Sequence, residues 1–160
     1  MARRVASWVF LLMILSLVGC DRATKAAAEA TLEPSGPVSL VKGVLELSYV
    51  QNHETAFSLS RFLDVPGKPL VLAAIALFAT LAIAVAAYRR RGQASRMEQV
   101  ATSLIVAGAA GNLLDRLRKG YVVDFIHLQH WPVFNVADVL VAAGGILLAW
   151  SLARDRRLPA

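Results

Sequence analysis

Two aspartates lie in apolar surroundings that suit acid–base chemistry. Asp124 interrupts the apolar run YVVDFI, where its neighbours are the wrong kind for a solvated loop acid, and desolvation should raise its pKa. Asp138 lies three residues after Asn135, at the start of an apolar segment. Two carboxylates in one low-dielectric cleft cannot both ionise easily, so one keeps a proton while the other activates a water molecule. The pair predicts hydrolysis of the aspartic-protease type. The same spacing also fits a helix N-cap at Asn135 with an acid at the third helical position.

Two further polar clusters stand at the ends of apolar segments. Asp21 and Lys25 are four residues apart, and Asn112 precedes Asp115 by three residues and Arg116 by four, so each cluster occupies one face of a helix. Each cluster also has an alternative interpretation. The first could be a simple ion pair, and the second could be a charged helix end at the lipid headgroups. Gly108 and Gly111, in the segment that carries Asn112, also fit close helix packing.

A metal or a nucleophilic residue offers alternative chemistry. His127 and His130 are three residues apart and could be combined with Asp124 or Asp138 as ligands, but the sequence contains no HExxH motif. Cys20 and the serines lack a recognisable base partner. The sequence therefore favours a site without a metal or other cofactor.

The composition indicates that these residues are positioned by membrane helices. Hydrophobic residues make up 57% of the 160 residues, charged residues make up 18%, and the mean hydropathy is +0.56, too apolar for an ordinary soluble domain. Helices that cross a bilayer need about 20 apolar residues. The sequence predicts a single membrane-embedded domain, residues 1–160, with four such helices, at about residues 5–22, 69–88, 97–115 and 136–154.

The basic residues indicate how the helices are oriented. Nine of the 17 Lys and Arg residues flank the two ends of the chain and the short link between the second and third helices: Arg3, Arg4, Arg89, Arg90, Arg91, Arg96, Arg154, Arg156 and Arg157. An excess of basic residues marks the cytoplasmic side, so both termini should be cytoplasmic. The three carboxylate-bearing helix ends then share the outer face of the membrane. The net charge of +6 is thus a topology signal, with a contact to membrane lipids, and does not indicate nucleic-acid binding.

The first outer segment, residues 26–68, is long enough to fold on its own. It begins Ala-rich and helical and then breaks at residues 34–37 (PSGP). Val38–Val41 and Val44–Val50 flank Lys42-Gly43 and predict a β-hairpin within an outer loop of about residues 37–63. A further short strand is predicted at Ala56–Ser60. The second outer segment, Leu117–Phe134, is short and aromatic. The predicted fold is a mainly α membrane protein with a small outer β-structure.

Five blocks of the sequence resemble the signal peptidase II family, the bacterial lipoprotein signal peptidases. The blocks are Asp21-x-x-Thr24-Lys25, Asn52 with Ala56-Phe57-Ser58, Gly111-Asn112-x-x-Asp115-Arg116, Val123-Asp124-Phe125 and Phe134-Asn135-x-Ala137-Asp138. They follow the family's order along nearly the whole chain. One departure is Glu54, which stands where the family usually has Gly, two residues after Asn52. A second departure is that the segment from Asp124 to Asp138 is compact compared with the same segment in many members of the family.

The resemblance implies a function and a set of site residues. It implies a monomeric aspartic endopeptidase of the bacterial inner membrane, inhibited by globomycin, that cleaves prolipoproteins on the N-terminal side of a diacylglyceryl-modified cysteine. Asp124 and Asp138 correspond to the catalytic pair. The matching supporting residues are Asp21, Lys25, Asn52, Gly111, Asn112, Asp115, Arg116 and Asn135. The family's outer β-structure forms a cradle over the substrate.

Two other functions remain to be weighed. A small transporter or ion-conducting protein would also carry intramembrane acids, but it should have polar residues at mid-helix, whereas the second apolar segment is apolar except for Thr80. A lipoprotein would be cleaved before Cys20, since LVGC resembles a lipid-attachment site. The three later apolar segments argue against a lipoprotein, so residues 1–20 are expected to be retained.

Overall fold

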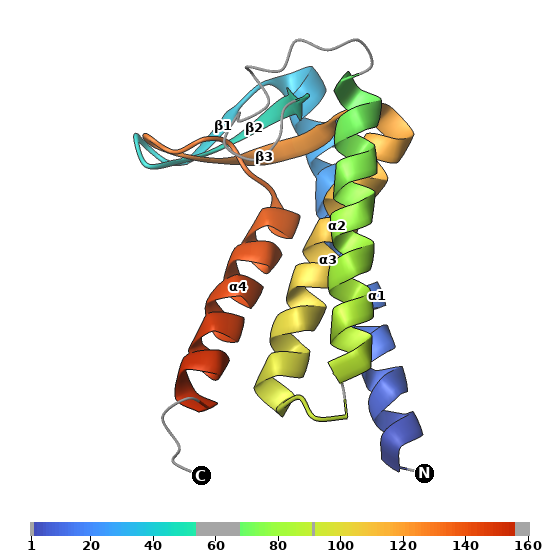
Figure 1. The fold of residues 1–160 in the computed structure, drawn as a ribbon. Coiled ribbons are helices and arrows are strands. Elements are labelled where there is room, and N and C mark those ends of the chain that lie inside the picture. The colour runs from blue at the N-terminus through green and yellow to red at the C-terminus, as the bar shows by residue number, and fades with distance from the viewer. Residues whose placement is uncertain (1, 54–67, 91, 156–160) are drawn as a thin grey trace.

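Four helices stand side by side, and a three-stranded sheet lies across one end of the bundle (Figure 1). The computed structural model describes residues 2–53, 68–90 and 92–155. Within these residues the helices are α1 (Ala2–Ser35), α2 (Lys68–Arg90), α3 (Arg96–Lys119) and α4 (Val136–Asp155), and the strands are β1 (Val38–Val41), β2 (Leu45–Asn52) and β3 (Val122–Leu128). The prediction of a mainly helical protein with a small β-structure is confirmed.

Helix α1 is longer than the predicted membrane segment. It continues without a break through the Ala-rich stretch after Lys25, and Gly36 ends it in a left-handed conformation with φ 79°. The backbone N–H of Gly36 donates to the carbonyl of Leu32 at 2.9 Å, which satisfies one of the last carbonyl groups. The predicted break after the Ala-rich helix is therefore confirmed, and the extra turns carry α1 up to the sheet.

Helices α3 and α4 pack closely because glycines line their contact. A β-carbon at Gly108 would lie 2.3 Å from the carbonyl oxygen of Ala137, and one at Gly144 would lie 2.7 Å from that of Ala101. No side chain fits at either position without moving a backbone. The interpretation of Gly108 as a helix-packing residue is confirmed, and this contact sets the position of the first turn of α4.

The sheet has the strand order β1-β2-β3, and both neighbouring pairs are antiparallel. The predicted hairpin is confirmed, with β2 slightly displaced from the predicted segment. Strand β3 was not predicted, because its first four residues are all buried and show no alternation. The strand predicted at Ala56–Ser60 lies outside the described residues. Phe125 of β3 packs against Ala28 and Leu32 of α1 and so fastens the sheet to the bundle.

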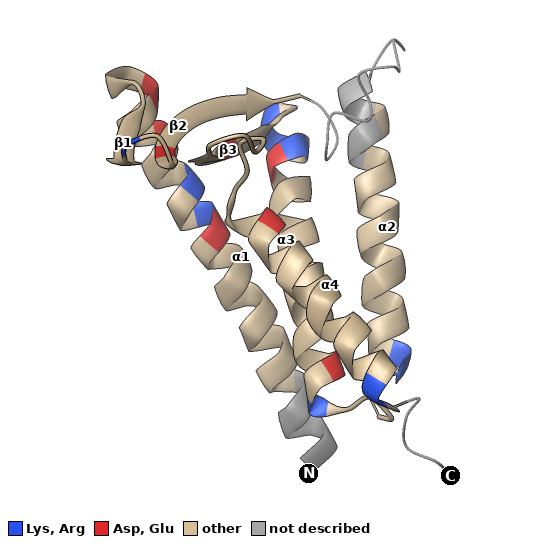
Figure 2. Cartoon of the chain, turned by 90° about the vertical axis from the view of Figure 1, so that its left-hand side faces the viewer, with Lys and Arg blue, Asp and Glu red and all other residues tan. Residues whose placement is uncertain are grey.

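Most charged residues of α1 run from near its midpoint, at Asp21, toward the sheet, whereas those of α2, α3 and α4 lie near the helix ends and leave the middles of these three helices uncharged (Figure 2). Large apolar side chains face outward there, including Phe78, Ile146 and Trp150, whose exposed fractions are 77%, 70% and 67%. Among the described residues, one helix is long and apolar enough to cross a membrane by hydropathy alone, Val136–Arg154, with a mean hydropathy of 2.0. All four predicted segments form helices, and their crossing of a membrane stays a prediction.

Candidate active site

Asp124 lies on β3 with an exposed fraction of 2%, and both of its carboxylate oxygens accept hydrogen bonds from amides. Asn52, at the end of β2, donates from Nδ2 to Oδ2 at 2.7 Å. Asn135 donates from Nδ2 to Oδ1 at 2.6 Å. Strand pairing brings Asn52 here, since it lies opposite Val122 in the register of β2 and β3. The two amides fix the orientation of the carboxylate.

Asp138 lies in the first turn of α4 and forms a reciprocal cap with Asn135. The backbone N–H of Asp138 donates to Asn135 Oδ1 at 3.0 Å, and the backbone N–H of Asn135 donates to Asp138 Oδ2 at 3.1 Å. Asn112 of α3 donates from Nδ2 to the other carboxylate oxygen at 2.8 Å. The helix-cap interpretation and the site interpretation of this motif are therefore compatible, because the cap itself aims the carboxylate.

Asn112 and Asn135 connect the two aspartates. Asn112 Oδ1 accepts from Asn135 Nδ2 at 3.1 Å and from Lys25 Nζ at 2.9 Å, so its amide nitrogen must face Asp138. Asn135 bonds Asp124 through Nδ2 and Asp138 through Oδ1. The amide flips of both asparagines are thus determined by a lysine and a backbone N–H, which can only donate.

A buried ionic cluster lies beneath this pair, and its members are Asp21, Arg22, Lys25 and Asp115. Lys25 Nζ lies 2.9 Å from Asp21 Oδ2 and 2.9 Å from Asp115 Oδ2, and all three side chains are at most 1% exposed. Arg22 Nη1 lies 2.5 Å from Asp115 Oδ1. The predicted i,i+4 ion pair of Asp21 and Lys25 is therefore present as one part of a larger network.

Backbone contacts join the ionic cluster to the elements that carry the catalytic candidates. The N–H of Ala137, in the first turn of α4, donates to Asp21 Oδ1 at 2.9 Å. The N–H of Val123, the neighbour of Asp124 on β3, donates to Asp115 Oδ2 at 3.3 Å. The cluster thus holds α4 and β3 against α1 and α3.

Gly111 and Arg116 complete the predicted set. A β-carbon at Gly111 would lie 2.5 Å from Asp21 Oδ2, so this position must lack a side chain for Asp21 to reach Ala137. Arg116 Nη1 donates to the carbonyl of Asn112 at 3.4 Å. The guanidinium group of Arg116 also interacts electrostatically with Asp138, Asp124 and Asp115. Arg116 therefore places a positive charge near both aspartates of the pair.

Burial raises the pKa of the Asp124 carboxyl to about 6. Removal from water is the largest cause, and the negative charge of Asp138 acts in the same direction. Hydrogen bonds from Asn52 and Asn135 and the charge of Lys25 act in the opposite direction without cancelling it. Asp124 is therefore suited to hold a proton near neutral pH, as one member of an aspartic pair must.

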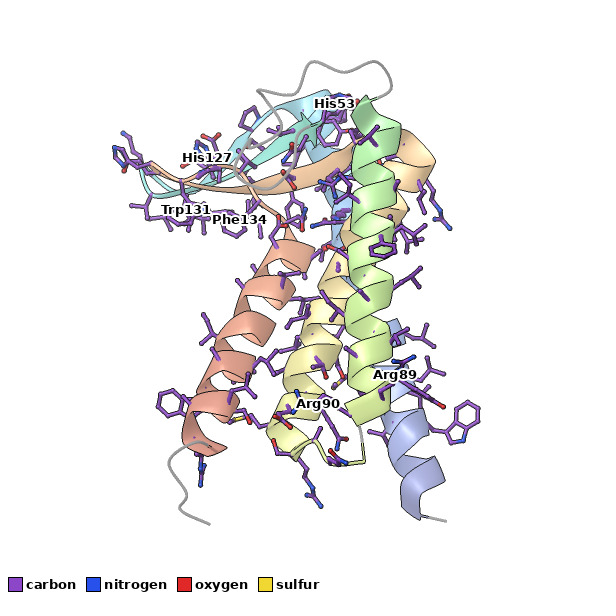
Figure 3. The ribbon with its side chains drawn as sticks, in the orientation of Figure 1. His53, Arg89, Arg90, His127, Trp131 and Phe134 are labelled. Carbon is purple, nitrogen blue, oxygen red and sulfur yellow. The ribbon has the colours of Figure 1, made fainter. Side chains whose placement is uncertain are left out.

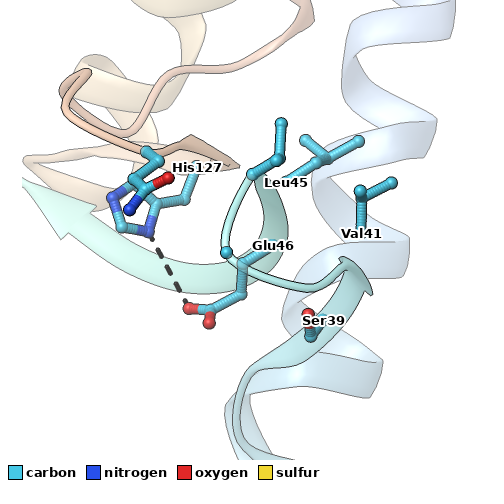
Figure 4. Close-up of a pocket in the computed structure, with 8 residues that line it drawn as sticks. Ser39, Val41, Leu45, Glu46 and His127 are labelled. Atoms are coloured by element: carbon cyan, nitrogen blue, oxygen red, sulfur yellow. Dashed lines mark ion pairs between the residues drawn. The ribbon is translucent and has the colours of Figure 1, made fainter.

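His127 and His130, the two histidines considered as metal ligands, lie away from the aspartic pair. His127 of β3 and Trp131, in the segment after β3, lie where the sheet projects beyond α4, whereas Arg89 and Arg90 lie at the opposite end of the bundle (Figure 3). The Nδ1 atom of His127 faces Glu46 Oε1 at 3.8 Å, beside a pocket of about 110 Å³ in the hairpin (Figure 4). His130 occupies the turn after β3 with φ 66°. In the described part of the chain, no three His, Cys, Asp or Glu side chains are grouped as metal ligands would be.

The structure adds participants that the sequence did not reveal. Arg22 was not among the predicted site residues, and the backbone N–H groups of Val123 and Ala137 carry no signal in a sequence. The position of Arg22 next to Asp21, one turn before Lys25, is the only hint. Asn52 was identified only through the resemblance to a family. Glu54 and residues 56–58 lie outside the described residues.

Known proteins resemble this chain over most of its length. The sequence profile of a family described as "Signal peptidase (SPase) II" matches residues 13–154. A lipoprotein signal peptidase of Syntrophomonas wolfei is 43% identical over 141 residues, which cover 88% of each chain. One of Geobacter metallireducens is 39% identical over 141 residues, covering 86% of this chain and 85% of its own. A solved structure described as a bacterial membrane enzyme shares 28% identity and has a TM-score of 0.79, covering 92% of this chain and 94% of that one.

Proposed function

The chain belongs to the signal peptidase II family, and from this premise we propose that it is an aspartic endopeptidase whose catalytic pair is Asp124 and Asp138. It removes signal peptides from prolipoproteins, the activity that its family and its relatives share. The observation that supports the pair most directly is Asn135. Its side-chain Nδ2 donates to the Asp124 carboxylate, its backbone N–H donates to the Asp138 carboxylate, and its Oδ1 accepts the backbone N–H of Asp138, so one residue holds both carboxylates to a common centre.

The surroundings assign different starting states to the two carboxylates. Asp124, with its raised pKa, carries the proton that the pair shares. Asp138 lies at the N-terminus of α4, where the helix dipole and the amide of Asn112 favour a negative charge. Asp138 is therefore the general base, and Asp124 is the general acid.

The reaction follows from these states. Asp138 accepts a proton from water, and the hydroxide oxygen bonds to the carbonyl carbon of the scissile peptide. The Asp124 proton stabilises the developing oxyanion, and a proton passes to the leaving nitrogen as the carbon–nitrogen bond breaks. One water is consumed, and the products are a carboxylate and an amine. Arg116, which interacts with both aspartates, limits the build-up of negative charge at the site.

The substrate and its location follow from the family and from the arrangement of the helices. The scissile bond is the one before a cysteine that carries diacylglycerol, whose acyl chains remain in the lipid beside the helices. The enzyme is a monomer of the bacterial inner membrane with both termini in the cytoplasm, and lipids surround its outward-facing apolar residues, such as Phe78 and Ile146. The site then lies at the outer face, beneath the sheet. The outer loop covers the substrate.

The proposal is tested by incubating the purified chain in lipid–detergent micelles with a diacylglyceryl-modified precursor. Both products are detected by intact-mass measurement. Asp124→Asn and Asp138→Asn should each reduce the rate by at least about 10³-fold, in line with the loss of an acid–base group. Their melting temperatures should stay near that of the parent chain. Glu46→Gln, on the distant part of the sheet, is the matched control and should retain activity. Globomycin should inhibit the parent chain. Full activity in either Asn variant, together with loss of activity on adding a chelator, would contradict the aspartic mechanism.

A further inference from the structure

Arg22 is an ionic residue of α1 that the proposed mechanism does not use. Its side chain is 28% exposed, yet its partner, the Asp115 carboxylate, is fully buried. An exposed ion pair on a protein surface contributes little. A pair with one buried member differs, because removing the cation leaves an unpaired charge where water cannot reach it.

The charges of the ionic cluster balance only when Arg22 is counted. Asp21 and Asp115 supply two negative charges, and Lys25 contacts both of them at 2.9 Å. Lys25 alone neutralises one of the two. Arg22 supplies the second positive charge on the side of Asp115 that Lys25 does not reach, at Oδ1. With both cations present, the cluster is neutral.

Asp115 connects the ionic cluster to β3, the strand that carries Asp124. Its Oδ2 atom accepts the N–H of Val123, the residue before Asp124. Arg22 and Lys25 hold the two oxygens of the carboxylate from opposite sides, so its plane is fixed relative to β3. A neutral side chain at position 22 would release Oδ1 and leave a net negative charge near Asp124.

We propose that Arg22 is a positioning residue of this enzyme, which neutralises Asp115 and thereby fixes β3 and keeps excess negative charge away from the Asp124 carboxyl. The inference rests on the proposed role of Asp124. Arg22 acts through Asp115 and does not enter the chemical step. Its effect should therefore be seen in the pH dependence and in kcat, with KM little changed.

Other charged groups act on Asp124 and set the background for this effect. They are Asp138 of α4, Lys25 of α1 and Arg116 of α3. All three remain in an Arg22 variant. An uncompensated charge on Asp115 therefore adds to a constant field and should make Asp124 harder to ionise, by on the order of one pH unit for a charge near 10 Å at an effective dielectric constant of about 20.

The test compares pH profiles of kcat/KM for the full chain and four variants: Arg22→Gln, Arg22→Lys, the double variant Arg22→Gln/Asp115→Asn, and the control Arg118→Gln. Arg118 is exposed in the last turn of α3, at the same end of the bundle, so its variant controls for the loss of a positive charge there. We expect Arg22→Gln to lower kcat about 10-fold. It should also shift the high-pH limb of the kcat/KM profile to higher pH by about one pH unit. In Arg22→Lys and Arg118→Gln the high-pH limb should stay at the pH where the parent chain has it. The double variant, whose cluster is neutral again, should return to it.

The outcomes separate this inference from the proposed function. A parent-like pH profile in Arg22→Gln would overturn the inference, as would a shifted limb that the double variant does not reverse. Arg22→Gln could fail to accumulate in the membrane. In that case charge balance predicts that the double variant does accumulate, and equal loss of both variants would overturn the inference. Asp124→Asn is measured beside them. Activity in that variant refutes the catalytic pair, whereas an inactive Asp124→Asn with an unaffected Arg22→Gln refutes only the role of Arg22.

Discussion

Gly111 offers a sharp test of how the helices position the site. The change Gly111→Ala adds one methyl group, which would lie 2.5 Å from Asp21 Oδ2, 3.1 Å from Asp21 Cγ and 3.4 Å from the β-carbon of Ala137. Ordinary contact needs at least about 3.4 Å, so the carboxylate and the methyl group must separate by roughly 0.9 Å. Asp21 cannot rotate away freely, because Lys25 holds one oxygen and the Ala137 N–H holds the other.

The displacement should therefore pass to α4. If Asp21 moves, the first turn of α4 loses a hydrogen bond or moves with it, and that turn carries both Asn135 and Asp138. Overpacking of this kind costs about 1–3 kcal/mol of stability. A misplacement approaching 1 Å at a reacting group costs on the order of 100-fold in rate. We expect Gly111→Ala to lower kcat between about 10-fold and 100-fold, with KM changed less.

The assay is cleavage of a diacylglyceryl-modified precursor, measured beside the thermal stability of the purified chain. Gly145→Ala on α4 and Gly19→Ala on α1 are matched controls, because a β-carbon at either position meets nothing within 4 Å. These changes should leave kcat unaltered and should raise the free energy of unfolding by about 1 kcal/mol, because alanine is more favourable than glycine in a helix. Parent-like kcat in Gly111→Ala would refute the argument that this glycine positions Asp21 and α4.

Four further predictions concern the acidity of Asp124, its effect on stability, the orientation of an amide and a peripheral ion pair. The pKa of Asp124 is raised from 3.8 to about 6, so its proton is lost as the pH rises through 6, and kcat/KM should fall with a slope of −1 on a logarithmic scale above that pH; a flat profile from pH 5 to pH 8 would contradict it. By the same linkage the contribution of Asp124 to stability is fully present below about pH 4 and is lost as the pH rises through about 6, so urea unfolding should occur at a lower urea concentration at pH 7 than at pH 5. Asn112→Ala removes the hydrogen-bond donor to Asp138 and should lower kcat about 100-fold. Asn112→Asp should lower kcat further, because it places a third carboxylate at the pair. Equal rates for the two variants would argue against the amide's role as donor. Lys119→Ala breaks a partly exposed ion pair with Glu29 and should cost less than about 1 kcal/mol of stability with no change in kcat, which thermal unfolding and the cleavage assay would check together.

The positions of the helices and their polar ends were predictable because apolar length and charge are local properties of the sequence. The chain predicts the hairpin and the end of α1 through residues 34–37, and both are present. Strand β3 was not predictable in the same way. Val122, Val123 and Phe125 are buried together with Asp124, so the strand shows no alternation of apolar and polar residues.

The site was predictable as a set of residues but not as a network. Asp124 and Asp138 could be inferred from acids in apolar surroundings, a signal that each residue carries alone. The contact between Arg22 and Asp115 joins residues 93 positions apart, and the bond from Val123 to Asp115 uses a backbone group that every residue except proline has. No pattern in the sequence specifies such contacts. The orientation of Asn112 likewise depends on Lys25 and Asn135, which come from two other elements.

The buried ionic cluster joins the helices and positions the site with the same atoms. Helices in lipid gain little from burying apolar surface against one another, so small residues and polar contacts must hold them together. Here Asp21 and Lys25 of α1 meet Asp115 of α3 and the first turn of α4, so a change that leaves one of these charges unpaired weakens assembly and alignment at once. Asp124 differs, because it lies on β3 and its carboxylate accepts hydrogen bonds from the amides of Asn52 and Asn135, outside the ionic cluster. Its conversion to Asn leaves the contacts of the ionic cluster in place but turns one amide donor of the site toward an NH2 group, so a loss of activity there is assigned to chemistry once the melting temperature is parent-like, whereas a loss at Asp21 cannot be separated from a displacement of α4.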